Sequence, residues 1–211
     1  MLRFEDELKD VLPRDLPNRD AVIAGCAYHL DLIVEANRIM NLTRIVSPRE
    51  AAVKHVLDSV IPWRMFAGAG HVLDAGTGAG FPGIPLALVL PDIRFTLAES
   101  IQKKARFVSS AAAAIGLPNV TVAARRAEEL TREIRFDIIT ARALAPLSRS
   151  LEWFGPALKR GAVALLYKGP DPAAEIAEAG TESTRIRIAL RFDLPEGMGS
   201  RSIVEARKAD R

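Results

Sequence analysis

The sequence contains a single cysteine, few aromatic residues and no apolar run long enough to cross a membrane. One cysteine, Cys26, excludes an internal disulfide and any cysteine-rich metal site, and we expect it to be buried as a small apolar side chain. Crossing a membrane takes about 18 or more consecutive apolar residues. The first ten residues, MLRFEDELKD, place acidic side chains where a secretory signal needs an uninterrupted apolar run. These absences predict a cytoplasmic protein that binds no metal.

The composition is that of a globular protein with a core and a mildly basic surface. Of 211 residues, 49% are hydrophobic and 26% are charged, and the net charge is +3. This length fits one large domain, or one domain with a helical extension. The charge permits a nucleic-acid partner without establishing one, because an ordinary solvated surface explains it equally well. Many basic residues fall in the second half of the chain: Arg125, Arg126, Arg132, Arg135, Arg142, Arg149, Lys159, Arg160 and Lys168.

The N-terminal third is expected to be helical. Residues 19–40 place apolar side chains at helical spacing, and the run NLTRIV that follows is typical of an extended turn. Ser47 and Pro48 mark another helix start, with Ser47 as N-cap and Pro48 at the first helical position. Glu50, three residues after the cap, is placed to close a capping box.

From about residue 70 the chain alternates short apolar runs with helical segments. The runs HVLDAG, IRFTLAES, VTVAAR, FDIITAR and AVALLYKG indicate βα units on a parallel sheet that is buried on both faces. The later segments TRIRIALRFDLP and RSIVEARK predict a terminal hairpin that adds antiparallel strands at one edge. We therefore predict an α/β fold, with a doubly wound, mostly parallel Rossmann-like sheet over residues 67–211 and an N-terminal helical extension over residues 1–66 packed against it.

A glycine-rich turn follows the first of these runs. The run ends at Asp74, and Gly76, Gly78 and Gly80 come before the next helix. Glycine has no Cβ, so the backbone can turn sharply there and approach a ligand closely. Doubly wound folds bind nucleotides at the carboxyl ends of their strands, beside a helix N-terminus. The turn therefore predicts a nucleoside site, with a purely structural tight turn as the alternative.

Two features favour a methyl donor over a dinucleotide. The dinucleotide fingerprint needs a third glycine where Phe81 stands. Asp74 lies before the glycines, near the expected place of the donor's amino-acid group, and a carboxylate suits an ammonium or sulfonium but not a pyrophosphate. Glu99 ends the second run, where its carboxylate can accept both ribose hydroxyls. NAD enzymes use the same device, and the alternative for Glu99 is an acid favoured by a helix dipole. Together these residues predict S-adenosylmethionine as cofactor.

Motifs on both sides of the turn extend the pattern. They are KHxxDS from Lys54, DAGTGAGFPGIPL from Asp74, KKxRF from Lys103, and the shorter NLT, RAE, ARA and YKG. In this order, from about residue 41 to 169, the chain resembles the RsmG (GidB) family. The resemblance implies S-adenosylmethionine-dependent methylation of N7 of a guanine in small-subunit (16S) ribosomal RNA. Glu99 stands where that family more usually has aspartate and Ala141 where it often has serine, and neither departure removes a needed group.

The resemblance also assigns residues to the cofactor. It implies contacts with the methyl donor for Gly76, Phe81, Ala127, Glu128 and Arg142. Ala127 and Glu128 follow the third strand, where such folds hold an adenine edge, and the alternative for Glu128 is a solvated first-turn acid.

Arg142 is the expected catalytic residue. Guanine N7 carries an in-plane lone pair, so no general base is needed and catalysis comes largely from positioning and electrostatics. Arg142 ends the fourth strand, and its guanidinium suits the cofactor carboxylate or the guanine O6. The alternative is a salt bridge with Asp137 or Glu128. We expect Arg142→Ala to abolish methylation and leave the fold intact.

Lys54, His55 and Lys168 are the expected RNA contacts. Lys54 and Asp58 are four residues apart, as are His55 and Ser59, so each pair shares one helix face that would form a lip of the active-site cleft. The alternative is an ion pair beside a surface histidine. Lys168, at the end of a strand on the cofactor side, is placed to meet phosphate or is an ordinary exposed lysine.

Two other functions stay open on the sequence. One is an NAD-linked oxidoreductase or other nucleoside-binding enzyme, against which Phe81 and the lack of a substrate domain both argue. The other is a non-catalytic RNA-binding protein, which the intact Asp74, glycines and Glu99 disfavour. The expected partner is ribosomal RNA or the small ribosomal subunit, with no membrane and no metal, and the chain is expected to be a monomer. His29 and His71 are expected to be structural.

Overall fold

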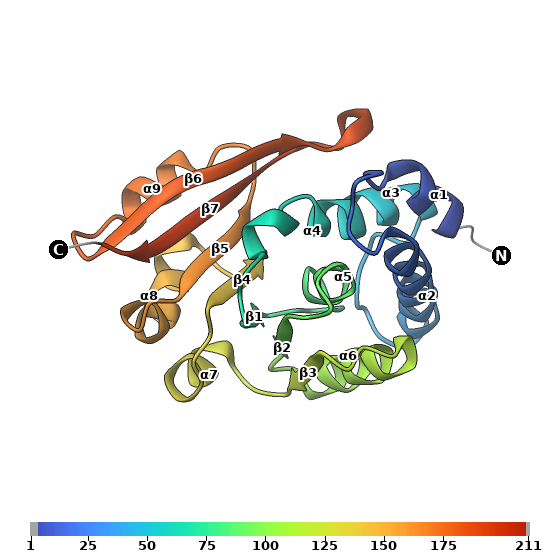
Figure 1. The fold of residues 1–211 in the computed structure, drawn as a ribbon, viewed down its shortest axis with the longest axis horizontal. Coiled ribbons are helices and arrows are strands. Elements are labelled where there is room, and N and C mark those ends of the chain that lie inside the picture. Colours follow the sequence, from blue (N-terminus) through green and yellow to red (C-terminus); the bar gives the residue numbers. More distant parts are fainter. Residues whose placement is uncertain (1–3, 210–211) are drawn as a thin grey trace.

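The computed structural model describes residues 4–209, which form a seven-stranded sheet with helices on both faces (Figure 1). The strand order is β3-β2-β1-β4-β5-β7-β6, and the first five strands are mutually parallel, as predicted. The strands are β1 (His71–Ala75), β2 (Arg94–Ala98), β3 (Val120–Ala123), β4 (Ile138–Arg142), β5 (Val163–Lys168), β6 (Thr184–Asp193) and β7 (Ser200–Lys208).

Helices precede the sheet and connect its strands. Before β1 lie α1 (Phe4–Val11), α2 (Arg19–Asn37), α3 (Pro48–Ala51), the π-helix η1 (Ala52–Leu57), α4 (Asp58–Val60) and the 3₁₀ helix η2 (Trp63–Phe66). Within and after the sheet lie α5 (Gly83–Val89), α6 (Gln102–Ile115), α7 (Ala127–Glu133), α8 (Leu147–Lys159), α9 (Ala173–Ala179) and the 3₁₀ turn η3 (Pro195–Gly197). No helix between residues 4 and 209 is both long and apolar enough to span a membrane.

The alternation of side chains along each strand produces two cores, one on each face of the sheet. On one face Leu73 and Ile139 pack with residues of α7 and α8. On the other face Val72 and Ile138 pack with residues of α5 and α6. Because both faces are covered there, the central strands β1, β2, β4 and β5 are mostly apolar, as the sequence runs indicated.

The predicted C-terminal hairpin is confirmed. Strand β7 pairs antiparallel with β5 and with β6, so it lies between them and β6 forms the edge. A register irregularity occurs in β6 between Ile188 and Leu190. The hairpin brings Arg201, near the start of β7, next to the end of β5.

A third core joins the N-terminal helices to the sheet. Cys26 on α2 is fully buried there, as expected, with Val53 of η1 and Phe81 of the glycine-rich turn. The capping-box prediction is wrong. Ser47 takes the N-cap position without a side-chain bond, and Glu50 instead accepts a hydrogen bond from Lys54 at 2.7 Å. The boundary at residue 66 between extension and methyltransferase domain stays a prediction.

Candidate functional site

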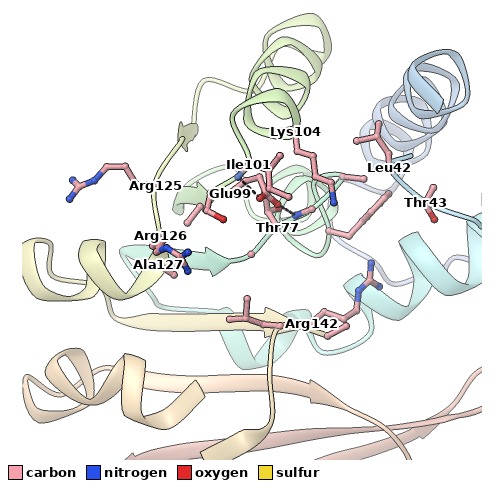
Figure 2. Close-up of a pocket in the computed structure, with 18 of the residues that line it drawn as sticks. Leu42, Thr43, Thr77, Glu99, Ile101, Lys104, Arg125, Arg126, Ala127 and Arg142 are labelled. Carbon is pink, nitrogen blue, oxygen red and sulfur yellow. Dashed lines mark hydrogen bonds between the residues drawn. The ribbon is translucent and has the colours of Figure 1, made fainter. Parts of the chain in front are cut away.

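A cavity of about 510 Å³ lies at the carboxyl ends of β1, β2 and β4 (Figure 2). Carboxyl ends of neighbouring parallel strands meet at one edge of a sheet, which is where doubly wound folds bind ligands. In Figure 2 Glu99 and Thr77 lie at the centre, Arg126 and Ala127 on one side, and Arg142 on the other.

The glycine-rich turn forms the floor of this cavity. Gly76 and Gly78 have φ values of 71° and 62°, which side chains rarely tolerate. A Cβ at Gly76 would lie 2.5 Å from Leu144 Cδ1, so a side chain there would be strained by its φ and would also displace Leu144. The backbone N–H groups of Gly76 and Thr77 both donate to Ala98 O, which ties the turn to the end of β2.

Asp74 is buried beneath the turn and does not line the cavity. Its Oδ2 accepts hydrogen bonds from Thr77 Oγ1 at 2.6 Å and from the Gly83 backbone N–H at 2.9 Å. Burial raises its pKa to about 6, against the lowering effect of these two hydrogen bonds. Asp74 therefore fixes the turn and the start of α5, and the predicted direct contact with a methyl donor is not part of this arrangement.

Glu99 lies at the cavity wall directly after β2, as expected. Its Oε1 accepts from the Ile101 backbone N–H at 2.8 Å and its Oε2 from the Gly78 N–H at 3.2 Å. Each carboxylate oxygen has a further lone pair, so two ligand hydroxyls can still be accepted. The two interpretations of Glu99 are compatible, because the same carboxylate also precedes the N-terminus of α6.

Ala127 and Glu128 form the opposite wall in the first turn of α7. The Glu128 side chain is 21% exposed and its Oε1 lies 3.7 Å from Arg126 Nη1. It is therefore not the fully solvated acid of the alternative interpretation. Lys104, from the KKxRF motif, lines the cavity as well.

Phe81 carries a stack of rings between the turn and the N-terminal helices. The His55 ring lies 4.6 Å from the Phe81 ring at an interplanar angle of 10°, and the His29 ring lies 4.9 Å from it. His55 is only 8% exposed, so the alternative of a surface histidine is wrong. His29 donates from Nε2 to Ala79 O at 2.8 Å, which holds the turn and fits its predicted structural role.

Both stacked histidines are poor bases in this site. Burial lowers the pKa of His55 to about 3, with the Arg142 charge lowering it further. Burial also lowers the pKa of His29 to about 4. Thr43 Oγ1 lies 3.0 Å from His55 Nε2 and lines the cavity, a role the sequence indicated only through the NLT motif. The third histidine, His71, contacts Thr96 Oγ1 from β1, away from the cavity.

Arg142 stands at the end of β4, as predicted, and its partner is Asp58. Its Nη1 donates to Asp58 Oδ2 and to Lys54 O, each at 3.0 Å. The acceptors belong to η1 and α4, where the π-helical turn orients backbone carbonyls toward the guanidinium; such turns are frequent at functional sites. The predicted alternative partners of Arg142 are wrong. Asp137 instead accepts hydrogen bonds from the backbone N–H groups of Gly70 and His71, at the start of β1.

A second cavity of about 470 Å³ adjoins the first, and Arg142 and His55 line both. Lys54 and Lys168, two of the predicted RNA contacts, also line it. Lys168 Nζ donates to Glu175 Oε2 at 2.7 Å and its side chain is 13% exposed, so it is not an ordinary exposed lysine. Lys54 pairs with Glu50 and not with Asp58.

Sequence reasoning gave no role to three polar residues of the second cavity, Tyr167, Glu175 and Arg201. Tyr167 donates its hydroxyl to Ser59 O at 2.7 Å, and Arg201 Nε lies 3.5 Å from Asp58 Oδ1. Tyr167 stood in the YKG motif without a stated role. Arg201 had no signal, because only the pairing of β7 with β5 brings it to the site. Within residues 4–209 no group of three or more metal-binding side chains occurs.

Comparison with known proteins identifies the family. Residues 24–192 match the family described as GidB, rRNA small subunit methyltransferase G. The chain is 62% identical to Ribosomal RNA small subunit methyltransferase G of Solibacter usitatus, over 98% of this chain and 100% of that one. It is 41% identical to the protein of the same name from Sorangium cellulosum, over 81% and 74% of the two chains.

A solved structure supports the fold. The O-methyltransferase TomG from Streptomyces achromogenes, in complex with SAM, superposes with a TM-score of 0.58 at 18% identity, covering 88% of this chain and 90% of that one. This likeness shows the Rossmann-like methyltransferase fold. The family match spans most of the N-terminal helices and of the sheet, and it covers the lining of the first cavity and, apart from Arg201, that of the second. The chain belongs to the rRNA small subunit methyltransferase G (GidB) family.

Proposed function

We propose that this chain transfers the methyl group of S-adenosylmethionine to N7 of a guanine in small-subunit ribosomal RNA. The observation that carries the proposal is the position of Arg142 between two adjoining cavities, one suited to a nucleoside cofactor and one lined by cations. The names of the relatives support ribosomal RNA as the substrate. The guanine and its N7 follow from the motifs shared with the family.

The first cavity fits S-adenosylmethionine. Its volume of about 510 Å³ is within the usual range for ligand sites, about 300–1,000 Å³. Glu99 would bind the ribose hydroxyls, Ala127 and Glu128 the adenine edge, and Gly76, Gly78 and Phe81 the remaining wall. When bound, S-adenosylmethionine supplies an electrophilic methyl group. Asp74 supports this site indirectly, through the turn that it holds.

The surrounding groups suit an acceptor atom that needs no deprotonation. His55 and His29 are neutral near pH 7 and too weakly basic to remove a proton efficiently. Guanine N7 carries its lone pair in the ring plane, so positioning and electrostatics suffice. Arg142 would orient the acceptor or the carboxylate of the donor, because its Nη1 is anchored and its other nitrogens bond to nothing in the described part of the chain.

The second cavity would receive the RNA. Its charged lining consists of four cations and two acids: Lys54, Arg142, Lys168, Arg201, Asp58 and Glu175. An excess of cations around a cleft attracts phosphate, and binding that depends on it weakens steeply with salt. A target base inside folded RNA has to be unstacked before it enters such a cavity. We place the reaction on ribosomal RNA or the small ribosomal subunit in the cytoplasm, with the enzyme as a monomer.

The test is transfer of labelled methyl to small-subunit ribosomal RNA from cells that lack this protein. We expect incorporation at one guanine, mapped by cleavage at 7-methylguanine, and none into RNA from cells that have the protein. Labelling at another base, or of protein in place of RNA, would overturn the proposal. Thermal shift with S-adenosylhomocysteine, with NAD and with buffer tests the cofactor separately, and we expect stabilisation by S-adenosylhomocysteine alone.

A further inference from the structure

Asp58 offers an unused acceptor at the wall of the second cavity. Its side chain is 2% exposed, and Oδ2 accepts from Arg142 Nη1 at 3.0 Å. Oδ1 is buried and has no hydrogen-bond partner among the residues that the structure describes. Arg201 Nε lies 3.5 Å away without the alignment of a hydrogen bond. Burying a carboxylate oxygen without a hydrogen-bond donor costs free energy. A ligand that donates an N–H group to Oδ1 removes this cost, which favours its binding.

Arg142 and Asp58 occupy successive positions on the way from the first cavity to the second. Arg142 lines both cavities, whereas Asp58 lines only the second. Arg142 anchors its Nη1 on Asp58 and the η1 carbonyls, and within residues 4–209 its Nε and Nη2 form no hydrogen bond. From the first cavity to the second, a ligand therefore meets hydrogen-bond donors and then an acceptor.

Guanine carries complementary groups in the same order. Along its edge lie the acceptors N7 and O6, followed by the donors N1–H and the exocyclic amino group. With N7 toward the first cavity, O6 faces the free donors of Arg142 and the N1–H and amino groups face Asp58. Adenine reverses this pattern, because it places an amino donor against Arg142 and an unprotonated N1 against the carboxylate.

We propose that Asp58 determines specificity for guanine by accepting hydrogen bonds from the N1–H and amino groups of the target base. The inference rests on the proposed function, since it takes methylation of a guanine as given. Arg201, whose side chain is 25% exposed, is displaced from Oδ1 as the base enters. The ion pair with Arg142 remains, so Asp58 positions the donor to O6 and reads the neighbouring atoms at the same time.

The test compares two RNA substrates, one with guanosine and one with inosine at the mapped target nucleotide. Inosine keeps N7, O6 and N1–H and lacks only the amino group. We expect wild-type enzyme to prefer guanosine by about tenfold or more in kcat/KM, the usual effect of losing one hydrogen bond to a buried charged acceptor. Asp58→Asn, which keeps the volume, should reduce that preference to about threefold or less, because a neutral amide accepts more weakly.

Glu175→Gln is the matched control. Glu175 is another carboxylate on the second cavity, and it pairs with Lys168 just as Asp58 pairs with Arg142. We expect its guanosine-to-inosine ratio to equal that of the wild type. A wild-type enzyme that treats both substrates alike overturns the inference, as does an Asp58→Asn enzyme that slows both equally. If the wild type methylates neither substrate, the proposed function itself fails.

Discussion

Replacing Arg142 tests whether the ion pair with Asp58 stabilises the fold as well as serving the reaction. Arg142→Met keeps most of the stem and removes the guanidinium, whose Cζ lies 5.4 Å from the centroid of the Phe81 ring. Asp58 then stays buried, with Arg201 at 3.5 Å as its remaining cation. Breaking a buried pair from one side costs about 3–5 kcal/mol, and the nearby charge of Arg201 keeps the expected loss at about 3 kcal/mol. The expectation from sequence that the fold is indifferent to Arg142→Ala is therefore revised.

A double-mutant cycle separates stability from activity. Asp58→Asn leaves Arg142 with the Lys54 and His55 carbonyls, so its cost should be about 1–2 kcal/mol. The double variant should be about 2 kcal/mol more stable than the sum of the two single losses predicts, because no charge is left unpaired. Methyl transfer should be lost in the Arg142→Met variant and also in the double variant, although the double variant recovers part of the stability.

The measurements are urea unfolding followed by circular dichroism and transfer of labelled methyl to RNA. Strictly additive free energies would refute the coupling that the 3.0 Å contact implies. Recovery of methyl transfer in the double variant would show that Arg142 serves the fold alone. His71→Gln is a suitable control, because His71 lies outside both cavities, where its ring contacts Thr96 and Phe136.

Three further predictions concern the first cavity. Glu99→Gln should weaken binding of S-adenosylhomocysteine about tenfold by calorimetry, since neutral acceptors bind hydroxyls less strongly than a carboxylate; unchanged affinity would remove Glu99 from the site. The pKa of Asp74 is raised from 3.8 to about 6, so its contribution to the free energy of unfolding falls as pH rises from about 4 to about 6. Asp74→Asn should remove this fall, as measured by urea unfolding at several pH values. A variant with the same pH profile as the wild type would contradict the assignment. The pKa of His55 is lowered from 6.5 to about 3, so its contribution to the free energy of unfolding is lost as pH falls through that interval. His55→Phe keeps a ring stacked on Phe81 and should make stability less dependent on pH in this acid range. A steeper loss of stability at acid pH would count against a buried neutral imidazole.

The sheet could be predicted because each strand has a pattern of its own. Runs such as HVLDAG and FDIITAR are apolar on both sides, which only a strand covered on both faces requires. The alternating segment after residue 184 differs and forms the half-exposed edge strand β6. The position of three site residues could be predicted in the same way, because the carboxyl ends of parallel strands meet at one edge of the sheet. These residues are Glu99, Ala127 and Arg142.

Contacts between distant segments could not be predicted in this way. The pair Arg142–Asp58 joins the end of β4 to the start of α4, and local spacing favoured Lys54 as the partner of Asp58. The π-helical turn of η1 separates Lys54 from Asp58, and Lys54 pairs instead with Glu50, four residues before it. For His55, a signal was present in its neighbours AAV and VL, which leave little room for an exposed face.

The orientation of Asp74 shows that the position of a residue on a strand decides which groups its side chain meets. Side chains alternate along a strand, so Asp74 points to the same face as Val72, which α5 covers. There it meets the Gly83 N–H at the start of α5. Counting from Val72 would have directed Asp74 away from the ligand edge. The glycines after it approach the ligand through backbone atoms, for which this parity does not matter.

The N-terminal helices are part of the site and more than a cover for the sheet. Together with the loop between α2 and α3, which contributes Thr43, they supply His55 to the first cavity and Asp58 to the second. Phe81 belongs to the same core as these helices, so the glycine-rich turn and η1 cannot shift independently. Arg142 takes every acceptor of its Nη1 from η1 and α4. A change in this N-terminal packing would therefore move both the floor of the first cavity and the guanidinium that faces the acceptor base. Substrate recognition thus depends on the part of the chain that precedes the sheet.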